Sequence, residues 1–183
     1  MKTEDYTEKT LQSQYIYKGK IVNLRKDYVE LPGGKKSTRE IVEHQGAVAV
    51  VPITKNNEII FVKQYRKPVE EVLLEIPAGK LEKGEEPREC AMRELEEETG
   101  KKASELHELF HFYTSPGFSN EKLYLFAATN LEDTIQNLDT DEILTVHSLS
   151  IDKAISMVKN GEIKDAKTIT GIFAIKDFLD ERK

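Results

Sequence analysis

The residues best suited to chemistry are glutamates that crowd one short stretch, residues 87–99, which has the composition of a helix. A proline opens the stretch, helix-forming residues follow it, and Gly100 is placed to end it. Each helical residue turns the chain by about 100°, so Glu94, Glu97 and Glu98 project within about 100° of one another. We therefore expect these three carboxylates to converge on one place. The five glutamates of the stretch are Glu89, Glu94, Glu96, Glu97 and Glu98.

Carboxylates packed this closely require a cation. Acidic residues three or four positions apart repel by roughly 0.2–0.5 kcal/mol, and acids near a helix C-terminus oppose the helix dipole. Arg93 can pair with Glu89 or Glu97 at four-residue spacing, but one guanidinium cannot neutralise the whole group. A ligand set of carboxylates without His or Cys favours magnesium or manganese over zinc. Taken alone, the cluster is either a divalent-metal site or a solvated acidic helix face.

The composition narrows the class of protein. With 183 residues, of which 38% are hydrophobic, the chain can form one main core and a small additional subdomain. The net charge of -6 argues against a nucleic-acid partner. Because the sequence has no membrane-length apolar run and does not start with basic residues followed by apolar ones, we expect no membrane association and a cytoplasmic location. Its single cysteine, Cys90, excludes an intrachain disulfide and a cysteine zinc site.

Turn signals divide the chain into two expected domains. Residues 15–30 and 37–43 have the character of short strands on either side of a Leu-Pro-Gly-Gly turn, which predicts a small antiparallel β subdomain over residues 1–45. The main domain is expected to span residues 46–183. Its order of strands and interspersed helices indicates an α+β or three-layer fold.

Within the main domain, residues 47–53 and 58–65 flank the pair Asn56-Asn57, and this pattern predicts a β-hairpin. The spacing of Ile, Phe and Leu residues predicts two helices near the end of the chain. Further strands are expected over residues 73–76, 106–114 and 122–128, and these two helices over residues 151–159 and 168–180.

The residues in and around the acidic helix include a set at fixed spacing: Gly79, Glu85, Arg93, Glu94, Leu95, Glu97, Glu98 and Gly100. This spacing resembles the Nudix box. The family has a bulky apolar residue after the final glycine, where this chain has Lys101. The resemblance covers about residues 46–149 and implies a Nudix-type mixed β-sheet sandwiched between helices, with the box forming a loop, a helix and a loop. It also implies an enzyme, a metal-dependent hydrolase.

The resemblance implies a role for each residue of the box. Arg93 corresponds to the arginine that orients the glutamates, and Glu85 to a supporting glutamate. Glu97 corresponds to a residue with a catalytic as well as a metal-binding role. The implied cofactor is Mg²⁺, with Mn²⁺ as the alternative. The metal ligands implied are Glu94, Glu97, Glu98 and the backbone carbonyl of Ala78.

Features outside the box resemble the ADP-ribose pyrophosphatase sub-family. Pro116 lies 16 residues beyond Gly100, like the downstream proline of that sub-family, and residues 62–66, 75–79 and 120–122 agree with it. The implied reaction is magnesium-dependent hydrolysis of ADP-ribose to AMP and ribose 5-phosphate. The implied assembly is a homodimer that exchanges residues 1–45 between subunits and holds the substrate across its interface. The alternative is a hairpin packed on its own chain.

The same resemblance implies how the substrate is held. Relatives often stack the adenine on an aromatic side chain, but Ile21 occupies one such position here, which leaves Tyr28 as the substitute candidate. The residues implied to contact the phosphates or the terminal ribose, or to lie beside them, are Arg39, Arg66, Gly117 and Glu121.

An acidic loop over residues 139–142 is implied to contribute to catalysis. Glu142 is the expected catalytic glutamate, with metal binding as its alternative role. Relatives commonly have two glutamates in this loop, and Thr140 stands where the first would be. If the general base of relatives corresponds to Thr140, then Glu97 or Asp141 must take its place.

Two other functions remain open at this point. The box does not exclude hydrolysis of another nucleoside diphosphate derivative, such as GDP-mannose, FAD or a dinucleoside polyphosphate. A Nudix-like module that senses a nucleotide without turnover is the alternative from a different class of protein. Such modules usually lose box glutamates, which this chain retains, and Pro116 together with the N-terminal unit favours ADP-ribose.

Overall fold

The computed structural model describes residues 6–138, 140 and 142–180. They form two compact units, which are described separately below. One contains Met1–Gly46 and Tyr113–Lys122, and the other contains Ala47–Phe112 and Leu123–Lys183. Residues 113–122 thus belong with the N-terminal unit although they connect two strands of the larger one, and the sequence offers no signal for this.

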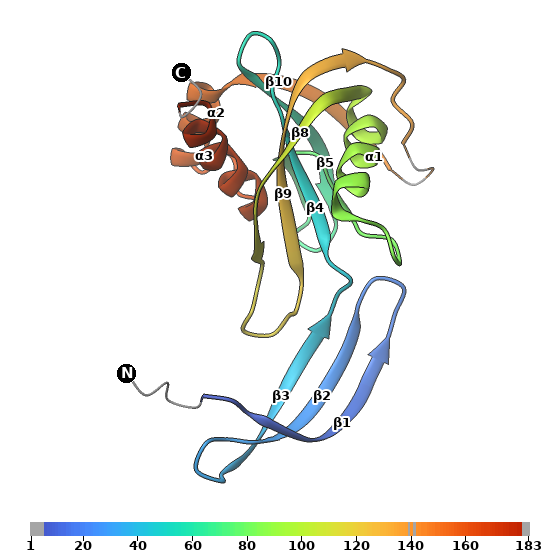
Figure 1. Ribbon diagram of the computed structural model, residues 1–183, viewed down its shortest axis with the longest axis vertical. Helices are drawn as coiled ribbons and strands as arrows, with labels where there is room; N and C mark the ends of the chain where they lie inside the picture. Colours follow the sequence, from blue (N-terminus) through green and yellow to red (C-terminus); the bar gives the residue numbers. More distant parts are fainter. Residues whose placement is uncertain (1–5, 139, 141, 181–183) are drawn as a thin grey trace. The chain divides into compact units, whose positions relative to one another are not determined.

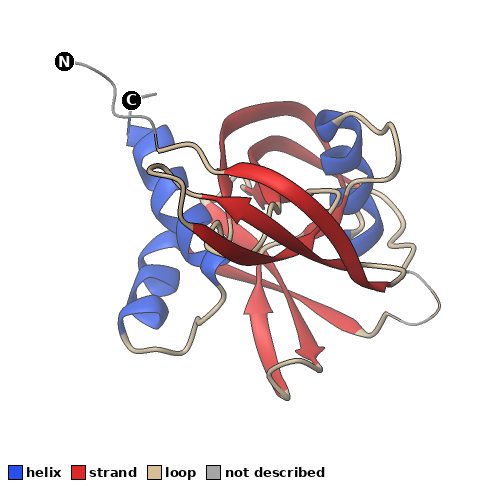
Figure 2. Ribbon diagram, turned by 90° about the horizontal axis from the view of Figure 1, so that it is seen from below, coloured by secondary structure: helices blue, strands red, loops and turns tan. Residues whose placement is uncertain are grey.

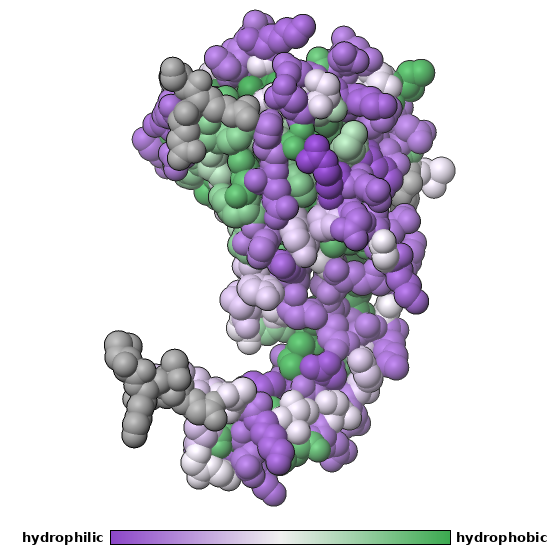
Figure 3. Space-filling view, in the orientation of Figure 1, coloured by the Kyte–Doolittle hydropathy of each residue, from purple (hydrophilic) through white to green (hydrophobic). Residues whose placement is uncertain are grey.

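The smaller unit is an antiparallel sheet of three strands in the order β1-β2-β3. The strands are β1 (Lys9–Lys18), β2 (Asn23–Glu30) and β3 (Lys36–Glu43). Strand β1 begins at Lys9, whereas the sequence predicted strand structure only from residue 15, because residues 9–14 are mostly polar. The sheet buries only Asp27 and Val29, whereas β1 is exposed throughout and carries apolar side chains. Leu11, Tyr15, Ile16 and Tyr17 are 44%, 45%, 54% and 59% exposed, and in Figure 3 hydrophobic groups are scattered over the surface of this unit. Exposed apolar side chains gathered on one strand are typical of an interaction face.

The larger unit has the expected α+β architecture, with a mixed arrangement of strands between helices. The strands form a four-stranded sheet of order β7-β4-β9-β8 and a three-stranded sheet of order β10-β5-β6. Strands β4 and β9 are parallel, and the other pairs described within these two sheets are antiparallel. Helix α1 lies on one side of the strands, and α2 and α3 on the other (Figures 1 and 2). The elements are β4 (Ala47–Pro52), β5 (Glu58–Arg66), β6 (Glu71–Glu75), β7 (Ala78–Lys80), α1 (Pro87–Thr99), β8 (Lys101–Tyr113), β9 (Lys122–Asp133), β10 (Leu144–Ser150), α2 (Ile151–Lys159) and α3 (Ala166–Asp180).

Strand β4 separates two hydrophobic cores. Its side chains alternate, so that Val48 and Val50 pack with helix α1, while Ala49 and Val51 pack in the core with α2 and α3. Both sets are fully buried. This two-sided burial explains why the strand is a continuous apolar run, as is typical of a strand covered by helices on both faces.

The predicted hairpin over residues 47–53 and 58–65 is wrong. A tight turn does connect β4 to β5, but the two strands belong to different sheets and share only an isolated bridge between Ile53 and Ile59. Strand β4 pairs with β7 and β9, and β5 pairs with β10 and β6. Each strand already has two partners, so neither has an edge left for the other. Strand β10, which completes the second sheet, had no clear sequence signal.

Candidate active site

Helix α1 is oriented by its apolar side. Cys90, Ala91 and Leu95 are fully buried in the core beside β4. The helix ends at Gly100, whose left-handed backbone (φ 62°) lets its N–H donate to the carbonyl of Glu96 at 2.9 Å, a conformation that favours glycine. Packing of the apolar side fixes the rotation of the helix and therefore the direction in which its glutamates project.

Glu98 is buried against the short strand β7. Its side chain is 2% exposed, and its Oε2 accepts a hydrogen bond from the backbone N–H of Ala78 at 3.1 Å. Burial, together with the smaller effect of the negative charges of Glu94 and Glu142, raises the pKa of Glu98 to about 8. A carboxyl group in this environment ionises readily only when a cation is beside it.

Glu94 lies next to the same strand. Burial raises the pKa of Glu94 above its ordinary value; Arg93 opposes this shift, whereas Glu97 and Glu142 add to it. A Cβ atom built on Gly79 would collide with the Glu94 carboxylate. The backbone at this position therefore lies against the carboxylate at a distance that only glycine permits.

Arg93 holds the acidic cluster in place. Its Nε and Nη2 donate to the two carboxylate oxygens of Glu85 at 2.9 and 3.1 Å. Its Nη1 donates to Glu94 at 2.7 Å and to Glu97 at 2.9 Å. Of the two pairings that the sequence left open, the contact with Glu97 is formed, and no contact with Glu89 is present among the described residues. The bond from Arg93 lowers the pKa of Glu85 to about 2.

The donor groups of this cluster fit a hard divalent cation. As placed, no group of three or more His, Cys, Asp or Glu within the described ranges could hold a metal ion. Arg93 occupies oxygens of both Glu94 and Glu97. Magnesium, however, binds through one or two carboxylates together with waters and substrate phosphates, and needs no closed protein cage. The buried Glu98 and the partly buried Glu94, both with raised pKa values, provide an environment that such an ion would stabilise.

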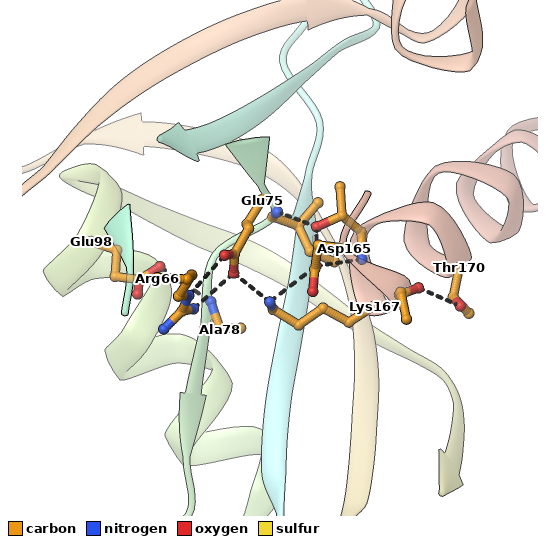
Figure 4. Close-up of polar contacts among 10 residues, drawn as sticks. Arg66, Glu75, Ala78, Glu98, Asp165, Lys167 and Thr170 are labelled. Atoms are coloured by element: carbon orange, nitrogen blue, oxygen red, sulfur yellow. Dashed lines mark hydrogen bonds and ion pairs between the residues drawn. The ribbon is translucent and has the colours of Figure 1, made fainter. Parts of the chain in front are cut away.

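Arg66, at the end of β5, lies between Glu75 and Glu98 (Figure 4). Its Nε and Nη2 donate to the two oxygens of Glu75, each at 2.7 Å. The pKa of Arg66 is raised chiefly by this bond, with smaller contributions from the charges of Glu98 and Asp165. Glu75 was not predicted as a site residue, although a glutamate inside the apolar run 73–76 was a signal, since buried acids are rare unless paired.

Three of the expected substrate-binding residues belong to the smaller unit. Arg39 donates to Ser37 Oγ at 3.1 Å and forms an ion pair with Glu8. Glu121 accepts a hydrogen bond from Thr114 Oγ1 at 2.6 Å. Arg39 and Gly117 line a common hollow, and Glu121 is not among its lining residues. That hollow has a volume of about 380 Å³, and its lining residues are Glu8, Arg39, Glu40, Ile41, Pro116, Gly117, Phe118, Ser119 and Asn120.

The candidates for adenine stacking are also in the smaller unit. Tyr28 is 38% exposed and Ile21 is 61% exposed. The ammonium of Lys26 lies 5.7 Å from the centroid of the Tyr28 ring, within the range of a cation–π contact. The Tyr28 ring is therefore available to a ligand on the surface of this unit.

The acidic loop begins close to the C-terminus of helix α1. The Asn137 N–H donates to the carbonyl of Glu97 at 3.1 Å, and Gln136 Nε2 donates to the carbonyl of Glu98 at 2.5 Å. These contacts satisfy carbonyls that have no partner within the helix. Glu142 is exposed, and its charge acts on Glu94 and Glu98. Thr140 is exposed in a turn, and Asp139 and Asp141 lie outside the described residues.

Comparison with known proteins gives consistent matches along the chain. Residues 43–171 match the family described as the NUDIX domain, and residues 8–42 match the nucleoside diphosphate sugar hydrolase N-terminal domain. An ADP-ribose pyrophosphatase of Bacillus subtilis is 47% identical over 180 residues, covering 96% of this chain and 97% of the relative. A methanol dehydrogenase activator of Bacillus methanolicus is 47% identical over 169 residues, covering 91% of each chain.

A solved structure described as an ADP compounds hydrolase has the same fold. Its TM-score is 0.86 at 21% identity, with 96% of each chain covered.

In this chain, no helix of the described part is both long enough and apolar enough to cross a membrane.

Proposed function

The chain belongs to the Nudix family, and we propose that it hydrolyses the pyrophosphate bond of ADP-ribose, with magnesium as cofactor, to AMP and ribose 5-phosphate. The observation that carries this proposal is the acidic face of helix α1, where the buried Glu98 and the partly buried Glu94 lie against the backbone of Ala78 and Gly79. The similarity over nearly the whole chain to a relative named ADP-ribose pyrophosphatase supports this substrate.

The box residues have complementary tasks in this proposal. Glu94, Glu97, Glu98 and the carbonyl of Ala78 would hold the metal. Bound divalent ions supply positive charge against the pyrophosphate and lower the pKa of a water molecule. Arg93 keeps the carboxylates of Glu94 and Glu97 together, because a single amine of its guanidinium contacts both.

Glu142 is proposed as the residue that takes the proton from the attacking water, with metal binding as its alternative role. Its support is the electrostatic effect of its carboxylate on Glu94 and Glu98, which indicates that it lies near the cluster. Glu97 is the alternative base, because its side chain is 35% exposed and can reach solvent. Comparing the pH–rate profiles of Glu142→Gln and Glu97→Gln tests the assignment, since loss of the base should remove the acidic limb of the profile, where activity rises as the base loses its proton.

Arg66, Arg39, Gly117 and Glu121 are proposed to contact the substrate. Arg66 lies beside the acidic cluster and carries a guanidinium suited to phosphate. Arg39 and Gly117 line a hollow large enough for part of a nucleotide. Alanine at Arg39 or Arg66 should raise the KM for ADP-ribose. An unchanged KM in either variant would remove that residue from the substrate site.

We also propose that the protein is a homodimer and that residues 1–45 form an exchanged β subdomain. The support is strand β1, which is exposed along its whole length and includes Tyr15, Ile16 and Tyr17, 45%, 54% and 59% exposed respectively. Light scattering coupled to gel filtration should give a dimer mass. Changing Ile16 and Tyr17 to serine should shift the mass toward the monomer, and a monomeric wild type would refute the proposal.

The activity is tested by incubating the purified protein with magnesium and each of four substrates, followed by chromatography of the products. The substrates are ADP-ribose, GDP-mannose, FAD and a dinucleoside polyphosphate, with Glu97→Gln and Glu98→Gln as controls. AMP and ribose 5-phosphate formed from ADP-ribose, and lost in both controls, would support the proposal. Preference for another substrate would overturn the substrate assignment, and no turnover at all would favour a non-catalytic nucleotide-binding module.

A further inference from the structure

A buried carboxylate, that of Glu75, joins two cations that come from distant parts of the chain. Its side chain is 1% exposed at the end of β6. Arg66 binds both of its oxygens at 2.7 Å, and the ammonium of Lys167, from helix α3, binds the same carboxylate (Figure 4). The Lys167 side chain is itself only 14% exposed. Such a buried ion pair is retained at a high desolvation cost, which calls for an explanation beyond fold stability.

The same network is fixed at the start of helix α3. Asp165 Oδ2 accepts from Lys167 Nζ at 3.0 Å and from the N–H of Thr168 at 3.0 Å. Thr168 Oγ1 donates to this oxygen at 2.6 Å and accepts the N–H of Ile76 at 2.9 Å. Helix α3 therefore holds both the side chain of Glu75 and the backbone of Ile76. Ile76 lies two positions before Ala78.

The bidentate contact leaves one amine of Arg66 available. Its Nε and Nη2 are taken by Glu75, and its Nη1 forms no hydrogen bond within the described residues. The Arg66 side chain is 40% exposed, and it lies next to Glu98. An arginine held through two of its three nitrogens presents the third in a fixed direction, so less rotational freedom is lost when it binds a phosphate oxygen.

We propose that Glu75, Lys167 and Asp165 are positioning residues that fix the guanidinium of Arg66 for the diphosphate of the substrate. Helix α3 thereby sets the affinity for the diphosphate without touching it. Glu75 orients Arg66, Lys167 holds Glu75 in place, and Asp165 holds Lys167. This inference rests on the proposed function, because it takes a diphosphate as the group that Arg66 binds.

The first test compares Lys167→Met with a matched control, Lys164→Met. Lys164 pairs with Glu71, but both side chains are about half exposed, at 56% and 48%. Exposed pairs of this kind contribute little. Steady-state kinetics with ADP-ribose should show KM raised about tenfold in Lys167→Met, the effect of one weakened charge-assisted hydrogen bond. KM should change less than about twofold in the control, and Lys167→Arg should restore most of the affinity.

A purely structural role for Lys167 would give a different result. Loss of folded protein lowers kcat by reducing the active fraction and leaves KM unchanged. The decisive measurement is a double-mutant cycle with Arg66→Ala. If Lys167 acts through Arg66, adding Lys167→Met to Arg66→Ala should change KM by less than about twofold. Additive effects in the cycle, or an unchanged KM in Lys167→Met alone, would overturn the proposal.

A binding measurement separates this inference from the proposed reaction. Titration calorimetry with magnesium and inorganic pyrophosphate needs no turnover, so it applies even if ADP-ribose is not the substrate. The affinity for pyrophosphate should fall in Arg66→Ala, Glu75→Gln and Lys167→Met and remain unchanged in Lys164→Met. If the variants show these pyrophosphate affinities but the wild type does not hydrolyse ADP-ribose, only the assignment of ADP-ribose as the substrate is refuted. Equal pyrophosphate affinity in Lys167→Met and the wild type, or no pyrophosphate binding by the wild type, would refute the positioning role.

Discussion

Replacing Glu98 with glutamine should stabilise the metal-free protein at alkaline pH while it abolishes activity. Burial raises the pKa of Glu98 from 4.5 to about 8, a difference of roughly 3.5. Each whole pKa step is worth about 1.4 kcal/mol, so ionised Glu98 costs the metal-free fold on the order of 5 kcal/mol. Glutamine has nearly the same shape, and its amide oxygen can still accept the Ala78 N–H.

The pH dependence follows from the direction of this shift. Because the folded pKa is raised, the unfolded chain loses this proton first as the pH increases. The stability that the folded protein gains by keeping Glu98 protonated is complete below about pH 4.5. It declines as the pH rises toward about 8 and is lost above that. Wild type and Glu98→Gln should therefore differ by less than about 1 kcal/mol near pH 5 and by several kcal/mol near pH 9.

Thermal unfolding with a chelator at both pH values tests this reasoning. Near pH 9 the Tm of Glu98→Gln should exceed that of the wild type by about 10 °C. Magnesium should raise the Tm of the wild type and leave the variant unchanged, because a ligand stabilises the folded state that binds it. Glu89→Gln, an exposed change on the same helix, is the control and should follow the wild type. A Glu98→Gln protein that is no more stable than the wild type near pH 9 would refute the argument.

Three further changes have specific expected outcomes. Gly79→Ala should lower kcat/KM about 100-fold or more, measured with ADP-ribose and magnesium, because the added methyl group displaces the Glu94 carboxylate. Asp165→Ala should lower the free energy of unfolding in urea by about 1–2 kcal/mol through loss of the contacts of Asp165 with Thr168 at the start of α3; an unchanged midpoint would show that these contacts do not stabilise the helix. Gln136→Ala should reduce kcat, with the fold intact by circular dichroism, because its amide anchors the start of the acidic loop to the Glu98 carbonyl; activity equal to the wild type would show that this anchor is dispensable.

The sequence by itself determined the acidic helix. The spacing of Glu94, Glu97 and Glu98 was sufficient because helical geometry is local and turns by a fixed angle at each residue. The bounds over residues 87–99 agree with α1, and the left-handed end at Gly100 agrees with its predicted role. The family resemblance rested on the same fixed spacing.

Only the tertiary structure decided which residues from distant segments meet. The pairing of Glu75 with Lys167 spans 92 residues, and no periodicity in the sequence links the two. The hairpin prediction failed for the same reason, since a turn fixes local geometry but the partners of β4 and β5 are chosen by sheets assembled from the whole chain. Burial, too, is a tertiary property, and it is burial that raises the pKa of Glu98 above that of an ordinary surface glutamate.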